Sequence, residues 1–370
     1  MLGAMNFITT ILNMRAPGWK DSPFYKTLQL RVVSFMNNKL TVCWNMLLLS
    51  FTLWVTINLM QEPAGNQNLE FGFPRDYMLA ITSISMIKVK TSKQLGYYLA
   101  GLTEGDGYIG TPSTTSKVKP NVTITFNLKD LTLAKKLSET IGFGNIRIQE
   151  KYNACRLTIS NTESLIKYVE LVNGKFRTPK IYALHNLINW LNENRNTSIQ
   201  TLPIDKSKFN DNAWLAGFSD ADSNFDIRVT DKSLNSVTDK LTKARVALRF
   251  RIEQQSSIPN VNLTYHPIIS DLATYFNVNL ATREYKSGKY NYILVVNTFE
   301  KVPIVINYFN SFPLMSSKYL DYQDWKEVYD MILTKDHLTE DGRIKIKFIK
   351  MKMNDNRVSI SWDHLNNFYN

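Results

Sequence analysis

The chain contains 370 residues, which is long enough for two or three domains. Its 44 lysine and arginine residues outnumber 32 aspartate and glutamate residues, and the net charge of +12 favours an anionic partner such as a nucleic acid. Two cysteines, Cys43 and Cys155, and four scattered histidines exclude a disulfide framework and the usual zinc-binding spacings.

The chain begins with MLGAMNFITTILNMRAPG, from Met1 to Gly18. This stretch resembles the end of a membrane helix and the following loop of cytochrome c oxidase subunit 1, and the resemblance stops after Gly18. We therefore expect residues 1–18 to be an oxidase-exon segment and residues 19–90 to be translated intron sequence. The whole then looks like a mitochondrial reading frame that runs from the exon into a group I intron.

Residues 40–60 form an uncharged run, LTVCWNMLLLSFTLWVTINLM, about long enough to cross the ~30 Å hydrocarbon core of a membrane as a helix. Basic residues precede the run, and Glu62 and Glu70 follow it, so a membrane span would keep its basic flank on the matrix side. The alternative is translated intron sequence without selected structure that proteolysis removes. Pro63 and Pro74 then break regular structure before the globular region.

A nine-residue phrase occurs twice, as LAGLTEGDG at Leu99–Gly107 and as LAGFSDADS at Leu215–Ser223. Each phrase is expected to be a helix that carries small residues spaced i,i+4 on one face. Such faces let two helices pack backbone against backbone, closer than the ~8–10 Å usual for bulkier contacts. The small residues of this predicted helix interface are Gly101, Gly105, Gly217 and Ala221.

Asp106 and Asp222 occupy the eighth place of the two phrases, near the negative pole of each expected helix. Two adjacent carboxylates there repel each other unless they share a cation. Hard oxygen ligands with open water positions suit Mg²⁺ (or Mn²⁺), which can activate a water and screen the charge of a phosphodiester. The alternative is a pair of ordinary buried helices whose terminal aspartates face solvent.

The two phrases resemble the LAGLIDADG motifs of the homing endonuclease and intron maturase family, in its single-chain form. The resemblance implies an α+β fold in which two pseudo-symmetric halves form a saddle-shaped pair of antiparallel sheets. It also implies that Asp106 and Asp222 are catalytic and bind the metal, with help from the peptide carbonyls of Gly105 and Ala221. One departure is the ninth place, where Ser223 replaces the glycine that relaxes the helix exit, so we expect Asp222 to be shifted slightly.

The repeat continues beyond the phrases, because Val122–Leu128 aligns with Val246–Ile252 and both alternate apolar residues at period two. The apolar positions of these strands are expected to face the helices. The opposite face is then free to contact bases or phosphates, and planar guanidinium groups suit both. We predict that this nucleic-acid-binding face contains Thr123, Thr125, Asn127, Lys129, Arg249 and Arg251. The alternative is a solvated sheet surface.

A further match sets Lys180, in RTPKIY, opposite Lys318, in MSSKYL. In the resembled family a basic residue near this place lies beside the metals, which implies a catalytic role for both lysines. An ammonium group there would stabilise developing negative charge on the phosphate. The alternative is a surface lysine that opens a helix.

Each half is expected to contain the element series αββαββα, with the motif helix first. We place half 1 at residues 91–196, half 2 at residues 197–332 and a basic C-terminal tail at residues 333–370. A polar stretch, Asn192–Asp211, is expected to be the extended linker between the halves. The lysines of the tail lie either along a nucleic-acid backbone or on a solvated helix face.

These features predict a monomeric, site-specific double-strand DNA endonuclease of the mitochondrion. It would act on the matrix side, bind DNA at the intron insertion site and use no small-molecule substrate. Its task would be the homing of its group I intron into the intronless oxidase subunit 1 gene. The alternative is an RNA maturase that binds its own group I intron RNA and assists splicing, and a third class is a membrane-anchored oxidase fragment with an inert appendage.

Overall fold

The computed structural model describes residues 93–112, 118–234, 241–257, 263–285 and 288–369, all within the unit Pro74–Asn370. The expected exon segment 1–18, the intron segment 19–90 and the predicted membrane span 40–60 lie outside these residues. Among the described residues, no helix is long and apolar enough to cross a membrane.

The elements of half 1 begin with the first motif helix, at residues 93–106, which leads directly into a strand. They continue as β1 (Gly107–Gly110), β2 (Asn121–Asn127), the short 3-10 helix η2 (Leu128–Asp130), α5 (Leu131–Ile141), β3 (Asn145–Gln149), β4 (Ala154–Ile159), α6 (Thr162–Val172) and α7 (Ile181–Arg195). The strands form one antiparallel sheet in the order β1-β2-β4-β3.

Half 2 repeats this series, beginning with the second motif helix. It contains α8 (Trp214–Asp222), β5 (Ser223–Thr230), β8 (Arg245–Gln255), α9 (His266–Tyr275), β9 (Leu280–Glu284), β10 (Tyr290–Val296), α10 (Val302–Ser311) and α11 (Lys318–Leu333). Its sheet has the matching order β5-β8-β10-β9. A small hairpin, β6 (Ser233–Leu234) with β7 (Leu241–Thr242), extends the connection from β5 to β8.

The expected α+β architecture with two four-stranded antiparallel sheets is confirmed. Each half adds one helix to the expected αββαββα series, because α6 is followed by α7 and α10 by α11. These added helices begin beside Lys180 and Lys318, so they place the two predicted lysines.

The strand register corrects the predicted alignment between β2 and β8. Gly107 pairs with Ile124 in half 1, and Ser223, at the same place of its motif, pairs with Ile252 in half 2. Val122 therefore corresponds to Phe250, and the predicted match of Val122 with Val246 is wrong by four residues. Because four is an even shift, the predicted inward and outward faces of both strands are unchanged.

The core of each half lies between its sheet and the helices that cover one face. Val122, Ile124 and Phe126 are buried, as predicted, whereas the strand ends at Asn127 and Leu128 begins η2. In half 2, the ring of Phe225 packs against four other aromatic rings with centroids 5.1–5.7 Å away: Phe250, Phe309, Tyr322 and Trp325. Aromatic packing of this kind adds to the apolar burial that holds a sheet against its helices.

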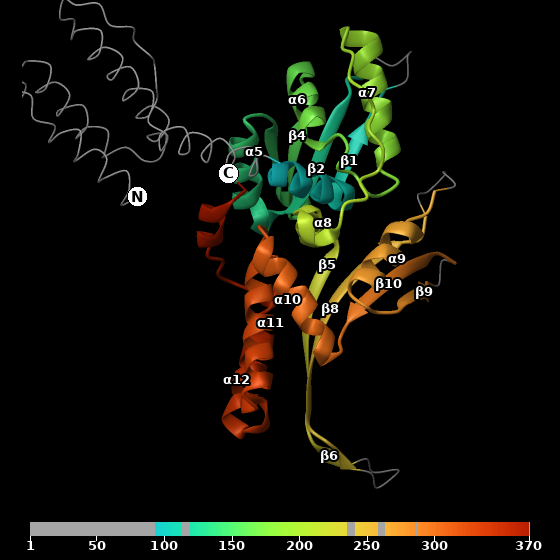
Figure 1. Ribbon diagram of the computed structural model, residues 1–370. Coiled ribbons are helices and arrows are strands. Elements are labelled where there is room, and N and C mark those ends of the chain that lie inside the picture. Colours follow the sequence, from blue (N-terminus) through green and yellow to red (C-terminus); the bar gives the residue numbers. More distant parts are fainter. Residues whose placement is uncertain (1–92, 113–117, 235–240, 258–262, 286–287, 370) are drawn as a thin grey trace, which may run out of the picture. The chain divides into compact units, whose positions relative to one another are not determined.

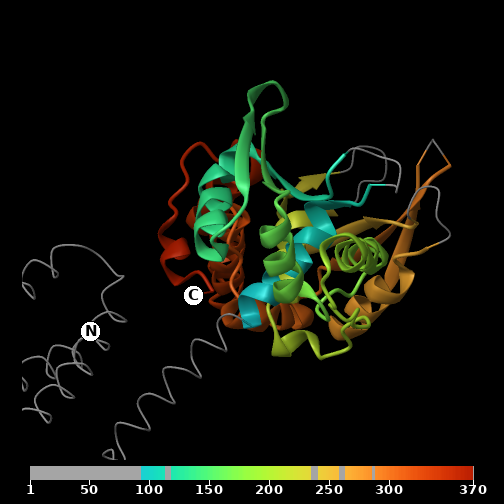
Figure 2. The same cartoon turned by 90° about the horizontal axis from the view of Figure 1, so that it is seen from above.

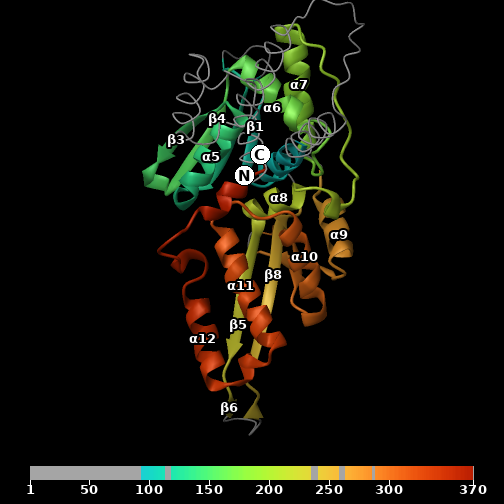
Figure 3. The same ribbon diagram turned by 60° about the vertical axis from the view of Figure 1, so that its left-hand side comes forward.

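The linker and the tail differ in detail from the prediction. Because α7 continues to Arg195, the linker starts at Asn196 rather than at Asn192. The tail contains α12 (Glu340–Met351), which packs beside α11 and β5 (Figure 3). The C-terminal segment, coloured red in Figure 2, returns to half 1. There Phe368 and Tyr369 contact the ring of Tyr98.

Candidate active site

The two motif helices cross at their glycines. A Cβ atom built on Gly101 would lie 2.0 Å from the carbonyl oxygen of Trp214, and one built on Gly217 would lie 1.9 Å from that of Tyr98. No side chain larger than hydrogen fits at such distances, so these two glycines let the helix backbones touch. Figure 1 shows α8 next to the blue-coloured first motif helix at this crossing.

One turn later, Gly105 faces Ala221. A Cβ on Gly105 would lie 2.2 Å from the Cβ of Ala221 and 3.2 Å from the Oδ2 atom of Asp222. The methyl group of Ala221 therefore occupies the space that Gly105 leaves. This close contact brings the ends of the two motif helices, and hence Asp106 and Asp222, to the same place.

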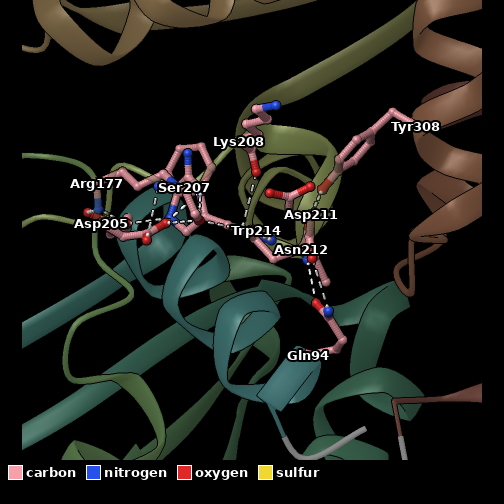
Figure 4. A network of polar contacts seen from close by, with 11 residues as sticks. Gln94, Arg177, Asp205, Ser207, Lys208, Asp211, Asn212, Trp214 and Tyr308 are labelled. Carbon is pink, nitrogen blue, oxygen red and sulfur yellow. Dashed lines mark hydrogen bonds and ion pairs between the residues drawn. The ribbon is translucent and has the colours of Figure 1, made fainter. Parts of the chain in front are cut away.

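Half 1 and the linker fix the start of α8 (Figure 4). The Oε1 atom of Gln94, at the start of the first motif helix, accepts a hydrogen bond from the backbone N–H of Ala213 at 2.9 Å. The amide of Gln94 also donates to the carbonyl of Asp211 at 3.2 Å, and Tyr308 donates to the carbonyl of Asn212 at 3.0 Å. Each helix start is thus tied to the other half, which sets the crossing angle that the glycines allow.

Asp106 and Asp222 end their helices as a pair of crowded carboxylates. Asp106 reaches the surface, yet desolvation by the surrounding protein raises the pKa of its carboxyl. Burial, followed by repulsion from Asp106, raises the pKa of Asp222 to about 6. The Oδ2 atom of Asp222 is buried and accepts no hydrogen bond from any described residue. An unpaired, buried carboxylate oxygen next to a second carboxylate has the chemistry of an incomplete cation site.

The carboxylates of this pair do not complete such a site by themselves. Across the described ranges of the chain, no group of three or more His, Cys, Asp or Glu side chains is placed to hold a metal ion. Further oxygen ligands would have to come from peptide carbonyls, water or a bound phosphate. Donors of that kind are typical of Mg²⁺, which keeps several waters and binds substrate phosphates.

Lys180 and Lys318 take equivalent places and contact the ends of the motif helices. The Nζ atom of Lys180 donates to the carbonyls of Gly105 and Gly107, both at 2.8 Å, and that of Lys318 donates to the carbonyl of Ala221 at 2.7 Å. These carbonyls are C-terminal groups of a helix, where a cation is favourable. Gly105 and Ala221, predicted to bind metal through the same oxygens, keep a second lone pair each.

The pKa of each lysine reflects both burial and the carboxylates. Burial lowers the pKa of the Lys180 and Lys318 ammonium groups, and the nearby carboxylates partly restore it. Lys318 is the strongest electrostatic influence that lowers the pKa of Asp106, and Asp222 is the strongest that raises the pKa of Lys180. Lys318 is also the strongest cationic influence on the pKa of Asp222, so this ammonium faces both carboxylates.

A cavity of about 210 Å³ opens beside Asp106. We call it the Asp106 cavity, and its polar lining combines Asp106 and Lys318 with Asn127, Lys129, Asp130 and Ser317. Lys180 and Asp222 are not among its lining residues, so the cavity lies beside Asp106 and Lys318.

Comparison with known proteins decides the family. The family model described as LAGLIDADG endonuclease matches residues 99–191 and 215–329, together more than half of the chain. The chain belongs to the LAGLIDADG endonuclease family. Members of this family are DNA endonucleases, which places the chain among the hydrolases that act on phosphodiester bonds.

Relatives of this LAGLIDADG chain include proteins with two different names. It is 33% identical to the intron-encoded DNA endonuclease aI3 of Saccharomyces cerevisiae over 306 residues, 75% of this chain and 73% of the relative. It is 34% identical to the intron-encoded RNA maturase bI4 of the same yeast over 125 residues, 34% of this chain and 18% of the relative. The I-LtrWI homing endonuclease, solved with its target DNA, shares the fold with a TM-score of 0.53 and 23% identity, over 72% of this chain and all of that one.

The sixth place of each LAGLIDADG motif carries a buried carboxylate that the sequence analysis did not single out. Glu104 accepts hydrogen bonds from the backbone N–H groups of Arg177 (3.0 Å) and Thr178 (2.5 Å), just before Lys180. Asp220 does the same for half 2, accepting from the backbone N–H of Met315 at 2.8 Å. The sequence did contain a signal for these two carboxylates, because both phrases have an acidic residue at the sixth place.

These two carboxylates also join the halves reciprocally. The indole of Trp214 donates to Glu104 at 2.6 Å, and the hydroxyl of Tyr98 donates to Asp220 at 2.8 Å. Tyr98 and Trp214 each precede their motif by one residue, so the two bonds are related by the pseudo-symmetry. Burial raises the pKa of Glu104 to about 7 and that of Asp220 to about 6, against the opposite effect of these donors.

The predicted nucleic-acid-binding residues lie on the sheet face away from the helices, with one exception. Thr123 and Thr125 are half-buried on that face, and Asn127 is exposed at its edge. Lys129 is not on the strand: it lies in η2, because Asn127 ends β2 and accepts a hydrogen bond from the Lys129 N–H. Its ammonium is 3.6 Å from Asp355 of the tail.

The two arginines of this face are not free guanidinium groups. Arg249 forms a short ion pair with Asp226 on the neighbouring strand β5, and Arg251 lies 3.6 Å from Glu253. The prediction did not include Asp226 because a cross-strand partner depends on the register, whereas Glu253 lies two residues after Arg251 on the same strand. Any contact that Arg249 makes with a phosphate therefore competes with Asp226.

Ser223, at the ninth place of the second motif, is accommodated without backbone strain. Ser223 is extended, with φ −105° and ψ 165°, a conformation that any residue adopts. Its hydroxyl donates to the carbonyl of Ser219 at 2.7 Å. In half 1 a Cβ on Gly107 would lie 2.5 Å from the carbonyl of Thr103, so glycine is needed there for space.

Proposed function

We propose that this LAGLIDADG chain is a site-specific double-strand DNA endonuclease that promotes homing of its own group I intron. The observation that carries the proposal is the meeting of Asp106 and Asp222 at the crossing of two motif helices, with the Oδ2 of Asp222 buried and unpaired. The pseudo-two-fold relation of the halves gives each DNA strand one aspartate and one lysine, so that a single monomer cuts both strands.

Mg²⁺ or Mn²⁺ fits this pair, and Asp106, Asp222 and the carbonyl oxygens of Gly105 and Ala221 would hold it. When bound, such an ion supplies an activated water and screens the charge of the phosphodiester. Lys180 and Lys318 are the chain's own contribution beside it. Held by helix-end carbonyls, their ammonium groups are preorganised to stabilise negative charge that develops on the phosphate.

The exposed sheet faces would bind the DNA. Threonine hydroxyls on β2, the amide of Asn127 and the guanidinium groups of β8 offer donors and acceptors for base edges and phosphates. A net charge of +12 adds a sequence-independent attraction. Asp226 and Glu253 hold Arg249 and Arg251 in fixed positions, which favours recognition of a particular site over general adhesion to phosphates.

The insertion site follows from the exon-like head of the chain. If the intron interrupts the oxidase subunit 1 gene after the codons for residues 14–18, the target spans that junction in an intronless copy, and the protein acts in the mitochondrion on the matrix side. A relative from Schizosaccharomyces pombe named as a cox1 intron-2 protein supports this location, with 30% identity over 70% of this chain and 73% of the relative.

Footprinting on intronless oxidase DNA tests the target. The full chain, with Ca²⁺ in place of Mg²⁺, should protect one continuous stretch that includes the exon junction, and a DNA fragment from elsewhere in the same gene serves as the control. Protection of another part of the gene, with none at the junction, would overturn the proposed target.

A second candidate function is RNA maturation, favoured by the similarity to the RNA maturase bI4. Binding of folded intron RNA does not require the carboxylate pair, whereas cleavage of DNA does. A splicing assay with Asp222→Asn separates the two functions. If the variant loses DNA cleavage but still supports splicing, the protein is bifunctional. If neither the variant nor the unaltered chain supports splicing, the chain is not a maturase.

A further inference from the structure

Asp130 is a buried aspartate whose hydrogen bond crosses between the halves. It is the N-cap residue of α5, where an aspartate ordinarily accepts from the N–H groups of its own helix. Within the described part of the chain it makes no such cap bond. Its Oδ1 atom instead accepts from the backbone N–H of Ser317, in half 2, at 2.7 Å. The carboxylate is therefore diverted from its own helix to the start of α11.

This bond breaks the pseudo-symmetry of the molecule at both of its ends. By the strand register, β2 and β8 end at matching places, and Asp130 follows β2, whereas residues 256–266 after β8 contain no acidic residue. The place that matches Ser317 in half 1 is Pro179, which has no backbone N–H to donate. The matching positions therefore have neither a carboxylate to accept nor an N–H group to donate. Half 1 holds the start of α11 through this bond, and half 2 has no equivalent bond to the start of α7.

The bond lies in the Asp106 cavity and ends one residue before Lys318. Asp130, Ser317, Lys318 and Asp106 all line this cavity. Lys318 is the first residue of α11, and its ammonium holds the carbonyl of Ala221. A shift at the start of α11 would move this ammonium relative to Asp106, and misplacements near 1 Å at a reacting centre have large kinetic effects.

We propose that Asp130 is a positioning residue that holds Lys318 in the Asp106 cavity and so sets the rate at which one of the two DNA strands is cut. The inference rests on the proposed endonuclease function and adds an asymmetry to it. The backbone just before Lys180 is held by the carboxylate of Glu104, whereas the backbone just before Lys318 is held by the carboxylates of Asp220 and Asp130.

Two variants remove the bond by independent routes. Asp130→Ala removes the acceptor, and Ser317→Pro removes the donor and copies Pro179 of half 1. Proline fits at residue 317 because the φ angle there is −56°. Asp130→Asn is the conservative control, because its amide oxygen can still accept the Ser317 N–H. Thermal unfolding of each variant checks that the fold is retained.

The readout is single-turnover cleavage of the target DNA with the two strands labelled separately. Both Asp130→Ala and Ser317→Pro should slow the cutting of one strand about tenfold and the other less than about twofold, and Asp130→Asn should restore the rate. The slowed strand should be the one that Lys318→Ala slows. Equal slowing of both strands, or slowing of neither strand, would overturn this proposal alone. If the unaltered chain cuts neither strand, the proposed endonuclease function is wrong, and this inference is wrong with it.

Discussion

At the scale of single residues, the site depends on how closely two backbones approach. Gly101 and Gly217 are the contacts that decide this distance, because the carbonyl oxygens of Trp214 and Tyr98 occupy the positions of their missing side chains. The aspartates at the helix ends meet only as long as these contacts hold. Spacing in the repeated phrase was enough to predict the glycines and both aspartates.

Gly101→Ala should destabilise the fold by about 1–3 kcal/mol or more, because the added methyl group collides with backbone and the helices must separate. Denaturant unfolding measures the change in the free energy of unfolding. Glu139→Ala, at an exposed position of α5, is the control and should stay within about 0.5 kcal/mol of the unaltered chain. Equal stability of all three proteins would contradict the described crossing.

The reciprocal bonds give a second prediction at this scale. Tyr98→Phe keeps the ring but leaves the buried carboxylate of Asp220 without one donor, so it should cost about 1–3 kcal/mol of unfolding free energy. Tyr152, whose side chain is 70% exposed, provides the control Tyr152→Phe. A Tyr98→Phe protein as stable as its control would show that the bond to Asp220 contributes nothing.

Contacts made by long side chains were not predictable from the sequence. Lys180 and Lys318 were recognised as equivalent, yet their bonds to helix-end carbonyls depend on α7 and α11 starting at the right place. Arg249 was predicted to bind nucleic acid without its partner Asp226, because Asp226 comes close only through strand pairing. A lysine or arginine reaches several ångströms, so its partner is set by tertiary structure rather than by spacing.

At the scale of elements, period-two alternation predicted which faces of β2 and β8 are buried, although the register was displaced by four residues. Alternation repeats every second residue, so two strand alignments that differ by an even number of residues give the same buried and exposed faces. The added helices α7 and α11 were not counted, because the expected series placed only one helix after the second pair of strands in each half. The tail was predicted as a basic segment that lies either along a nucleic-acid backbone or on a solvated helix face, and it contains the helix α12.

His364, in the C-terminal segment, predicts how the stability of the protein depends on pH. This imidazole stacks on Tyr319 at 4.3 Å and bonds the carbonyl of Met315, and burial lowers its pKa below 6.5. In the unfolded chain the imidazole takes up its proton at a higher pH than in the folded chain. Stability should therefore fall as the pH drops through about 6.5.

His364→Gln tests this dependence because glutamine keeps a hydrogen-bonding side chain and does not titrate. The free energy of unfolding, measured at pH 7.5 and pH 5.5, should fall less in the variant than in the unaltered chain. An identical fall in both proteins would mean that other groups cause the acid sensitivity.

At the scale of the whole molecule, we propose that the two similar halves present one surface to DNA, and the chain carries a net charge of +12. Net charge predicts how that surface behaves in salt, because each neutralised phosphate releases counterions. We expect the affinity for target DNA to fall by about 10³-fold or more between 50 and 200 mM salt, as measured by fluorescence anisotropy with Ca²⁺. A change of less than about tenfold would mean that few phosphates are contacted.

The whole molecule also contains an asymmetry that the repeat in the sequence does not show. The halves are alike in element order and sheet order, but the connection from Asp130 to Ser317 exists on one side only. Of the two matching residues Pro179 and Ser317, only Ser317 has a backbone N–H group to donate. The sequence repeat already places Pro179 opposite Ser317, whereas the bond from Ser317 to Asp130 depends on the tertiary structure.

The central claim is that Asp106 and Asp222 form one metal-dependent centre that cuts both strands. Single-turnover cleavage of DNA with the intronless oxidase junction, in Mg²⁺, tests it most directly when the unaltered chain is compared with Asp106→Asn/Asp222→Asn. We predict double-strand breaks by the unaltered chain, no breaks when EDTA removes the metal, and binding without cleavage by the double variant. Cleavage by the double variant, or binding without any cleavage by the unaltered chain, would contradict the account.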